Sequence, residues 1–249
     1  MNLDGTTVVL GLGLSGCAAA KLAVRKGADR VVGLDLRDQV DPIPGVELQL
    51  GPHRRETFLQ ASRIVVSPGI PSTQPDLVAA QAAGVPIFGE LAFADSFLDL
   101  PMAGITGTNG KSTVTWFAGR LLEASGRRPF VGGNLGNPLS NAVDGDFDCA
   151  VVEVSSYQLE WPGDFNPQIG VILNLTPDHL ARHGDMRGYA AAKAKIFERM
   201  GPGQLAVLPV GDELLVDAAG HRGARAWLGG SPGVTRRDDI IEVTWQGGS

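Results

Sequence analysis

Short apolar runs alternate with helical patterns along the first third of the chain. The runs at Thr6–Leu10, Arg30–Leu36 and Arg63–Ser67 are apolar and rich in β-branched residues, which is typical of buried strands. Between them lie an alanine-rich stretch over Cys17–Lys26 and the stretch "DLVAAQAAG", which Gly84 ends; both patterns are typical of helices. Strands that alternate with helices predict a parallel sheet covered by helices.

The same alternation begins again after Glu90. The stretch "LAFADSFLDLP" has a helical pattern that stops at Pro101, and a new apolar strand follows over Met102–Thr106. The later elements predicted are helices over Lys111–Ala124 and Gly188–Met200, strands over Ala150–Val154, Gly170–Leu175 and "QLAVLPV", and one or two edge strands in the tail "GVTRRDDIIEVTWQGGS". A short strand is also predicted before Glu90, at "VPIFGE". We therefore predict two α/β domains, one over residues 1–95 and one over residues 96–249.

The composition narrows the classes of partner. Of the 249 residues, 43% are hydrophobic and 19% are charged, and the formal charge is −6 with no run of Lys or Arg. This balance argues against a nucleic-acid surface and against a polybasic membrane patch. Cys17 and Cys149 lie in apolar stretches and are expected as buried free thiols in a reducing cytoplasm. The chain has no apolar run of membrane-spanning length, and its first residues lack the basic region of a signal peptide.

The first strand leads into a glycine motif. In "TTVVLGLGLSGCAAAKLAV", Gly11, Gly13 and Gly16 stand between a strand and a helix, and Asp35 follows Gly16 by 19 residues. This is the context of a Rossmann-like diphosphate-binding turn, in which the glycines allow a tight turn, close approach of a phosphate, and helix packing. NAD, FAD and a UDP-linked substrate all present a diphosphate. The alternative is a tight turn that binds no ligand.

A second motif, "GTNGKST", resembles a P-loop with one departure. The usual spacing needs glycine at position 105, where the chain has Ile105, so the loop must have a different local shape. We expect its backbone amides to bind ATP phosphates, Lys111 to reach the outer phosphates, and Ser112 to ligate Mg²⁺. The alternative is a Ser/Thr-capped helix start with no phosphate. The residues predicted at the nucleotide are Gly107, Thr108, Asn109, Gly110, Lys111, Ser112 and Thr113.

Glu153 ends the predicted strand "CAVVEV". An acid at the carboxyl end of a buried parallel strand faces the ligand crevice of an α/β sheet. We therefore expect Glu153 to ligate Mg²⁺ beside the P-loop-type turn, as acids at this position do in other nucleotide-binding proteins.

The stretch "GITGTNGKST" resembles the ATP loop of the Mur ligase family, enzymes that add amino acids to the peptidoglycan precursor. Six more stretches occur in the family's order, namely "GLGLSG", "SPGI", "GELAF", "GGNLGNP", "EVSSYQLE" and "LNLTPDHLARH". Together they are most similar to the D-glutamate-adding branch of that family. The resemblance implies a Rossmann-like domain, then a P-loop-type α/β central domain. The implied reaction is ATP-dependent ligation of D-glutamate to UDP-N-acetylmuramoyl-L-alanine through an acyl phosphate.

The resemblance also implies roles for residues that the local chemistry alone would not select. His179 and Lys193 would be metal ligands beside Ser112 and Glu153, with Lys193 carbamylated, and Lys111, Glu153, His179 and Lys193 would form the catalytic set. From the residues alone, a lone histidine or a helical lysine is more often structural or solvated. The implied substrate contacts are Leu14, Ser15, Asp35, Arg37, Ser67 and Gly69 for the UDP end, and Asn134 and Ser155 for the sugar or peptide part.

The family has a third, C-terminal domain that holds D-glutamate and completes the ATP pocket. Because the sequence stops at "TWQGGS", we expect a form without that domain, monomeric, which binds the UDP-sugar but does not complete the ligation. Three alternatives remain open at this point. They are an NAD(P)-dependent oxidoreductase based on Gly11–Gly16 and Asp35, a nucleotide-binding switch protein, and a Mur ligase for another amino acid.

Overall fold

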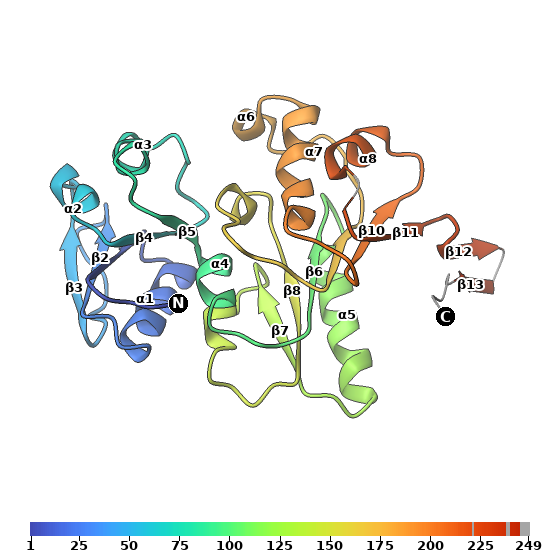
Figure 1. Cartoon of the computed structure of the whole chain (residues 1–249), viewed down its shortest axis with the longest axis horizontal. Coiled ribbons are helices and arrows are strands. Elements are labelled where there is room, and N and C mark those ends of the chain that lie inside the picture. Colours follow the sequence, from blue (N-terminus) through green and yellow to red (C-terminus); the bar gives the residue numbers. More distant parts are fainter. Residues whose placement is uncertain (221, 238–239, 245–249) are drawn as a thin grey trace. The chain divides into compact units, whose positions relative to one another are not determined.

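The computed structural model describes residues 1–220, 222–237 and 240–244. The chain forms two compact units, each with its own sheet (Figure 1). The first unit contains Met1–Asp99 together with two later segments, Gly136–Asp146 and Glu160–Phe165. The second unit contains Leu100–Leu135, Phe147–Leu159 and the described residues from Asn166 onward. The predicted domain boundary between residues 95 and 96 stays a prediction.

The first sheet has five parallel strands in the order β3-β2-β1-β4-β5. Strand β1 lies between β2 and β4, so the order of strands reverses beside it, and ligands bind at such reversals outside the carboxyl ends of the strands. This arrangement confirms the predicted Rossmann-like α/β fold. The strands are β1 Thr6–Leu10, β2 Arg30–Asp35, β3 Val46–Leu50, β4 Arg63–Val66 and β5 Ile87–Gly89.

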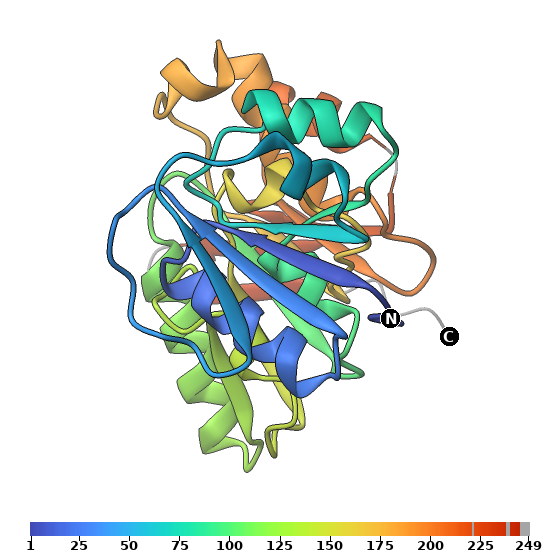
Figure 2. The same cartoon turned by 90° about the vertical axis from the view of Figure 1, so that its left-hand side faces the viewer.

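Helices cover both faces of the first sheet (Figure 2). Helix α1, Leu14–Arg25, packs on the strands through buried alanines such as Ala19 and Ala23, whose small side chains allow a close approach. Helices α2, Arg55–Leu59, and α3, Pro75–Ala82, lie on the opposite face (Figure 2). The core on that face joins alternate strand residues to one residue of α2 and two of α3, namely Val8, Leu10, Val32, Leu34, Ile64 and Val66 with Phe58, Leu77 and Ala80.

The second sheet has eight strands in the order β13-β12-β11-β10-β9-β6-β8-β7, parallel except for the β12–β13 pair. Its strands are β6 Met102–Thr106, β7 Pro129–Gly133, β8 Cys149–Glu153, β9 Ile169–Ile172, β10 Leu205–Pro209, β11 Ala224–Leu228, β12 Gly233–Arg237 and β13 Ile240–Thr244. The strands predicted in the tail are β12 and β13; β13 lies at the sheet edge as predicted, whereas β12 pairs with strands on both sides. The prediction had no counterpart for β3, β7 and β11.

The helices of the second unit are α5 Lys111–Ala124, α6 Leu180–His183, α7 Met186–Ala194 and α8 Glu213–Ala219. Helix α5 has the predicted bounds and packs on β7 and β8, where Gly119 is needed because a Cβ there would lie 2.4 Å from Val131 Cγ2. The predicted helix over residues 188–200 is instead α7 followed by a 3₁₀ turn over Lys195–Phe197. Among the described residues, no helix is both long and apolar enough to span a bilayer.

Two segments from the later part of the sequence complete the first unit. The backbone amide of Gly89 in β5 donates to the Trp161 carbonyl at 3.0 Å, and the Trp161 side chain packs against the core that includes Phe58 and Leu77. The other segment contains the 3₁₀ turn η1, Leu139–Asn141, which packs on α1 and on α4, Glu90–Asp95. The first unit is therefore not made from the N-terminal residues alone.

Candidate active site

The P-loop-type turn connects β6 to α5, and its shape depends on two glycines. Gly107 has φ +152° and Gly110 has φ +81°, both in the range that L side chains avoid. Ile105, by contrast, is still inside β6, where it is buried and paired in register with Glu153. The absent glycine at position 105 is thus explained, because in this chain the turn starts two residues later.

Asn174, which follows β9, holds the turn in place. Its Oδ1 accepts from the amides of Thr108 at 3.1 Å and Asn109 at 2.9 Å, and its Nδ2 donates to the Asn109 carbonyl at 3.0 Å. Two of the amides predicted to contact phosphate are therefore engaged by a side chain. The first turn of α5 offers further N–H groups, since the initial amides of a helix have no partner within it. The sequence prediction gave Asn174 no role, although it follows a predicted strand in the stretch "LNLTPDHLARH".

Two lysines meet at the Gly107 carbonyl. Lys111 Nζ donates to it at 3.0 Å and to the Thr108 carbonyl at 2.8 Å. Lys193 Nζ donates to the same Gly107 oxygen at 2.8 Å and lies 4.5 Å from the centre of the Tyr189 ring. Lys193 is 1% exposed, and burial, with the neighbouring positive charge of Lys111, lowers its pKa to about 7.

Glu153 lies at the end of β8, beside the strand that leads into the turn, and is 2% exposed. Its Oε1 accepts from Asn134 Nδ2 at 2.7 Å, whereas its Oε2 is buried and finds no hydrogen-bond partner in the described part of the chain. A buried carboxylate oxygen without a partner is costly unless a cation or donor reaches it. The predicted role of Glu153 as a Mg²⁺ ligand is consistent with this unpaired oxygen.

His179 lies in an aromatic cluster next to the turn. It has φ +51°, its amide donates to Asp178 Oδ1 at 2.8 Å, and its Nδ1 lies 3.2 Å from the Tyr157 hydroxyl. Its ring also meets Tyr189 at a centroid distance of 6.3 Å, and the Tyr189 hydroxyl lies 3.5 Å from Thr108 Oγ1. The cluster places His179 and Lys193 against the same tyrosine. The sequence prediction gave no role to Tyr157, which lies in the stretch "EVSSYQLE", or to Tyr189, which lies in none of the quoted stretches.

The predicted metal ligands do not form a ready-made cage. Within the described ranges, no group of three or more His, Cys, Asp or Glu side chains is arranged to hold a metal ion. The predicted set has only two such residues, Glu153 and His179, and relies on the Ser112 hydroxyl and a modified Lys193 for the rest. Ser155, predicted at the substrate, has its amide and hydroxyl bonded to Gln158 Oε1 at 2.9 and 3.0 Å.

In the first unit, the glycine motif forms the turn between β1 and α1. Gly11 has φ +85°, and a Cβ on Gly16 would lie 1.8 Å from the Gly11 carbonyl oxygen, so helix and turn are in direct contact. The hydroxyl of Ser67, which follows β4, donates to that same oxygen at 2.6 Å. A Cβ on Gly13, in contrast, would meet no atom within 4 Å. Gly13 is therefore the position at which a ligand could approach the backbone.

Asp35 and Arg37 form a fixed pair beside this turn. Asp35 Oδ1 accepts from Arg37 Nε at 2.9 Å, and Oδ2 accepts from Arg37 Nη2 at 2.9 Å and from the Leu12 amide at 2.7 Å. The hydrogen bonds from Arg37 hold the pKa of Asp35 well below its usual range. Both carboxylate oxygens thus already accept hydrogen bonds, so a ligand hydroxyl, on a nicotinamide cofactor or on a UDP-linked substrate, would have to share them.

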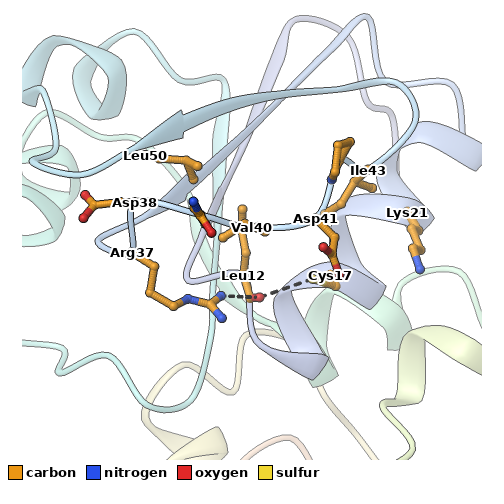
Figure 3. A pocket seen from close by; sticks show the side chains of 11 residues that line it. Leu12, Cys17, Lys21, Arg37, Asp38, Val40, Asp41, Ile43 and Leu50 are labelled. Atoms are coloured by element: carbon orange, nitrogen blue, oxygen red, sulfur yellow. Dashed lines mark hydrogen bonds between the residues drawn. The ribbon is translucent and has the colours of Figure 1, made fainter.

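Cavities lined by described residues lie beside this turn and beside Asp35 and Arg37. One of about 780 Å³ lies between α1 and the segment after β2, with Cys17, Lys21 and Arg37 among its lining residues (Figure 3). A second, of about 520 Å³, is lined by Gly13, Leu14, Lys21 and Arg37 together with Gly136, Pro138 and Asn141. A third, also of about 520 Å³, includes Gly11, Asp35, His53 and Gly69. Of the predicted substrate residues, Leu14 and Arg37 line the second cavity and Asp35 and Gly69 line the third. Ser15 and Ser67 line none of these three.

The sequence matches two family models. The Mur ligase middle domain matches residues 105–248, and the N-terminal domain of MurD-like Mur ligases matches residues 5–89. The chain belongs to the Mur ligase family. The two matches cover both units and include both glycine motifs.

Individual relatives agree with this assignment. The chain is 44% identical over 218 residues to a UDP-N-acetylmuramoylalanine–D-glutamate ligase of Desulfatibacillum aliphaticivorans, covering 84% of this chain and 48% of the relative. It is 46% identical over 230 residues to the enzyme of that name from Anaeromyxobacter dehalogenans, covering 88% of this chain and 49% of the relative. The chain thus spans about half the length of these relatives.

Solved structures support the fold. A UDP-N-acetylmuramate:L-alanyl-gamma-D-glutamyl-meso-diaminopimelate ligase from Neisseria meningitides superposes with a TM-score of 0.60 at 17% identity, covering 92% of this chain and 79% of that one. At this identity the likeness concerns the fold alone. The relatives and the solved structure named here are all ligases, and the oxidoreductase alternative gains no support from them.

Proposed function

We propose that the chain supplies the UDP-sugar-binding and ATP-binding parts of a ligase that joins D-glutamate to UDP-N-acetylmuramoyl-L-alanine, with residues 1–95 and 96–249 as its two domains. The observation that supports this most directly is the second unit's constellation of a P-loop-type turn, Lys111 and the unpaired Glu153 oxygen. The sequence identity of 44–46% to enzymes named for this reaction points the same way. Use of ATP and two free thiols are both compatible with a reducing cytoplasm.

The reaction we propose has two steps. A carboxylate oxygen of the UDP-linked substrate attacks the γ-phosphorus of ATP, the bond to the bridging oxygen breaks, and ADP and an acyl phosphate form. The amine of D-glutamate then attacks the acyl carbon, loses a proton, and expels inorganic phosphate to give the amide. The protein contributes mainly positioning and charge stabilisation, which are the dominant contributions in phosphoryl transfer.

Lys111 and the start of α5 would bind the triphosphate. The Lys111 ammonium, which now contacts the Gly107 and Thr108 carbonyls, would turn to the outer phosphates and compensate their charge. The amides of Gly110, Lys111, Ser112 and Thr113 would add donors at the positive end of the helix dipole. The predicted contacts of Thr108 and Asn109 require Asn174 to release their amides or to share them.

Glu153, Ser112, His179 and a carbamylated Lys193 would hold Mg²⁺. The ion would neutralise phosphate charge and polarise the transferring group. With its pKa near 7, the amine of Lys193 is largely neutral in mildly alkaline solution, and a neutral amine can add to CO₂ and release a proton. The carbamate would give an anionic oxygen where a bare ammonium would repel the metal.

The first unit would bind the UDP end of the substrate through Leu14, Ser15, Asp35, Arg37, Ser67 and Gly69, and Asn134 and Ser155 would contact the sugar or peptide part. The guanidinium of Arg37 is held by Asp35 and by the Leu12 carbonyl at 2.8 Å, so it is oriented before the ligand arrives. Gly13, which has open space beside it, would admit the diphosphate to the backbone at the start of α1.

Isothermal titration calorimetry tests the proposal. The chain is titrated with UDP-N-acetylmuramoyl-L-alanine, with ATP and Mg²⁺, and with NADH. We expect saturable binding of UDP-N-acetylmuramoyl-L-alanine. In Lys111→Ala the Kd for ATP should rise by about a hundredfold, because one or two charge-assisted contacts to phosphate are lost. The matched variant Lys195→Ala should keep the wild-type affinity. Binding of NADH without binding of the UDP-sugar would overturn the proposal.

A further inference from the structure

Glu90 is a buried acid outside the ATP site. It opens α4 and is 1% exposed. Its Oε1 accepts two hydrogen bonds from one residue, from the Ser140 amide and the Ser140 hydroxyl, both at 2.7 Å. Its Oε2 is buried and has no hydrogen-bond partner among the residues that the structure describes. Burying a carboxyl group with one oxygen unpaired costs free energy of folding. Glu90 is therefore expected to have a role that an apolar residue could not fill.

Ser140 belongs to the segment Gly136–Asp146, which lies between β7 and β8 in the sequence but forms part of the first unit. Further contacts fasten this segment to α1. Arg25 Nη2 donates to the Ser140 carbonyl at 3.3 Å, and Asp144 pairs with Lys26 at 2.5 Å. Those contacts lie at the exposed end of α1, and Leu139, Ala142 and Val143 of the segment are buried by apolar packing. Glu90 adds a buried polar attachment through Ser140.

The segment forms one wall of a cavity at the glycine turn. Gly136, Pro138 and Asn141 line the cavity of about 520 Å³, and Gly13 and Leu14 line it from the turn. Pro138 and Asn141 stand on either side of Leu139 and Ser140 in the sequence, and Ser140 is completely buried with Leu139. The position of this wall therefore depends on where Ser140 is held.

We propose that Glu90 is a positioning residue for the UDP-linked substrate, acting through Ser140 to hold Pro138 and Asn141 opposite the glycine turn. The inference rests on the proposed function, since it takes this cavity as the place of the diphosphate-linked part of the substrate. The Glu90 Oε1 atom accepts hydrogen bonds from both the amide and the hydroxyl of Ser140. These directional bonds fix the position and the orientation of the 3₁₀ turn, which apolar contacts do not do. Glutamine retains an acceptor oxygen, so Glu90→Gln should keep the positioning role. Alanine has no acceptor, so Glu90→Ala should lose it.

Calorimetry on the full chain compares Glu90→Ala, Glu90→Gln and Ser140→Ala. For UDP-N-acetylmuramoyl-L-alanine we expect a Kd about tenfold higher in Glu90→Ala, severalfold higher in Ser140→Ala, and within about threefold of wild type in Glu90→Gln. ATP affinity should stay unchanged in all three. The matched control is Ser96→Ala at the C-cap of the same helix, whose hydroxyl donates to the Phe93 carbonyl at 2.7 Å and to Met1 Sδ at 3.7 Å, away from Ser140. Unchanged UDP-sugar affinity in Ser140→Ala would overturn the proposal even if Glu90→Ala fails to fold.

A ligand-free measurement separates the two proposals. Hydrogen exchange of the Ser140 amide, which Glu90 accepts at 2.7 Å, should quicken by at least about tenfold in Glu90→Ala and stay slow in Ser96→Ala. If the wild-type chain binds no UDP-sugar, the proposed function fails and the positioning role fails with it, although exchange still shows whether Glu90 holds the segment. If the wild type binds and Glu90→Ala binds equally well, only the positioning role fails.

Discussion

Lys111 and Lys193 donate to one and the same oxygen, the carbonyl of Gly107, at 3.0 and 2.8 Å. Two ammonium groups on one acceptor repel each other, and the buried member of the pair has its pKa lowered to about 7. The arrangement keeps Lys111 folded back on the turn, and burial together with the charge of Lys111 lets Lys193 lose its proton near neutral pH. In the proposed function, phosphate would draw Lys111 away and CO₂ would modify Lys193, so each event would relieve the repulsion.

Replacing Lys193 should change how stability depends on pH. The pKa of Lys193 is about 7 in the folded protein, against 10.5 for a lysine in an unfolded chain. Between these pH values the unfolded state binds more protons than the folded state. The free energy of unfolding of the wild type should therefore rise with pH across that window, relative to Lys193→Met. Below the window the variant should be the more stable protein by a few kcal/mol, because it no longer buries a charge. Urea unfolding at several pH values in CO₂-free buffer measures the free energy of unfolding of both proteins. A difference between them that does not change with pH would contradict the prediction.

Local patterns explain why α5 was predicted with its observed bounds. A strand, a glycine-rich turn and a helix start at Lys111 are all encoded within a few neighbouring residues. The strand β3, with sequence "VELQL", lies at a sheet edge and is only partly buried, so its apolar signal is weak. Strand β7, "PFVGG", begins with proline and ends in two glycines, which favours a loop from sequence alone.

Tertiary contacts account for what the sequence did not show. Asn174 and Tyr189 lie more than sixty residues after Thr108, and nothing in their neighbourhood indicates that both meet it. The same holds for the segment Gly136–Asp146, which follows a strand of one unit and packs in the other. Motifs predicted the kind of site, whereas the residues that hold its loops depend on packing between distant parts of the sequence.

Asn174 is expected to support the ATP turn. Asn174→Ala would remove the three side-chain hydrogen bonds to Thr108 and Asn109, of 3.1, 2.9 and 3.0 Å. We expect a loss of about 1–2 kcal/mol in the free energy of unfolding and a Kd for ATP raised about tenfold, because the turn must then be ordered by the ligand. Asn2→Ala, an exposed asparagine in the first unit, is the control. Tighter ATP binding in Asn174→Ala would show instead that the side chain competes with phosphate.

Two glycines of the first motif should respond differently to alanine. In Gly16→Ala the new Cβ would lie 1.8 Å from the Gly11 carbonyl oxygen, so we expect destabilisation by about 2–4 kcal/mol. In Gly13→Ala the new methyl group would meet no atom within 4 Å, and the backbone φ of −76° suits alanine. This variant should unfold like wild type and bind UDP-N-acetylmuramoyl-L-alanine more weakly. Thermal unfolding measures the stability of both variants, and calorimetry measures their affinity for the UDP-sugar. Equal losses of stability in Gly13→Ala and Gly16→Ala would refute the prediction.

Glu90 should give the opposite pH dependence to Lys193. Burial raises the pKa of Glu90 from 4.5 to about 7, although the hydrogen bonds from Ser140 lower it. Between pH 4.5 and about 7 the folded state therefore binds more protons than the unfolded state. The wild type should therefore lose stability as pH rises through this window, relative to Glu90→Gln, which cannot ionise. Below the window the two proteins should differ little, and above it the difference should level off. Urea unfolding of both proteins over this range checks the sign, and a difference that shrinks with rising pH would show that Glu90 is stabilised as the anion.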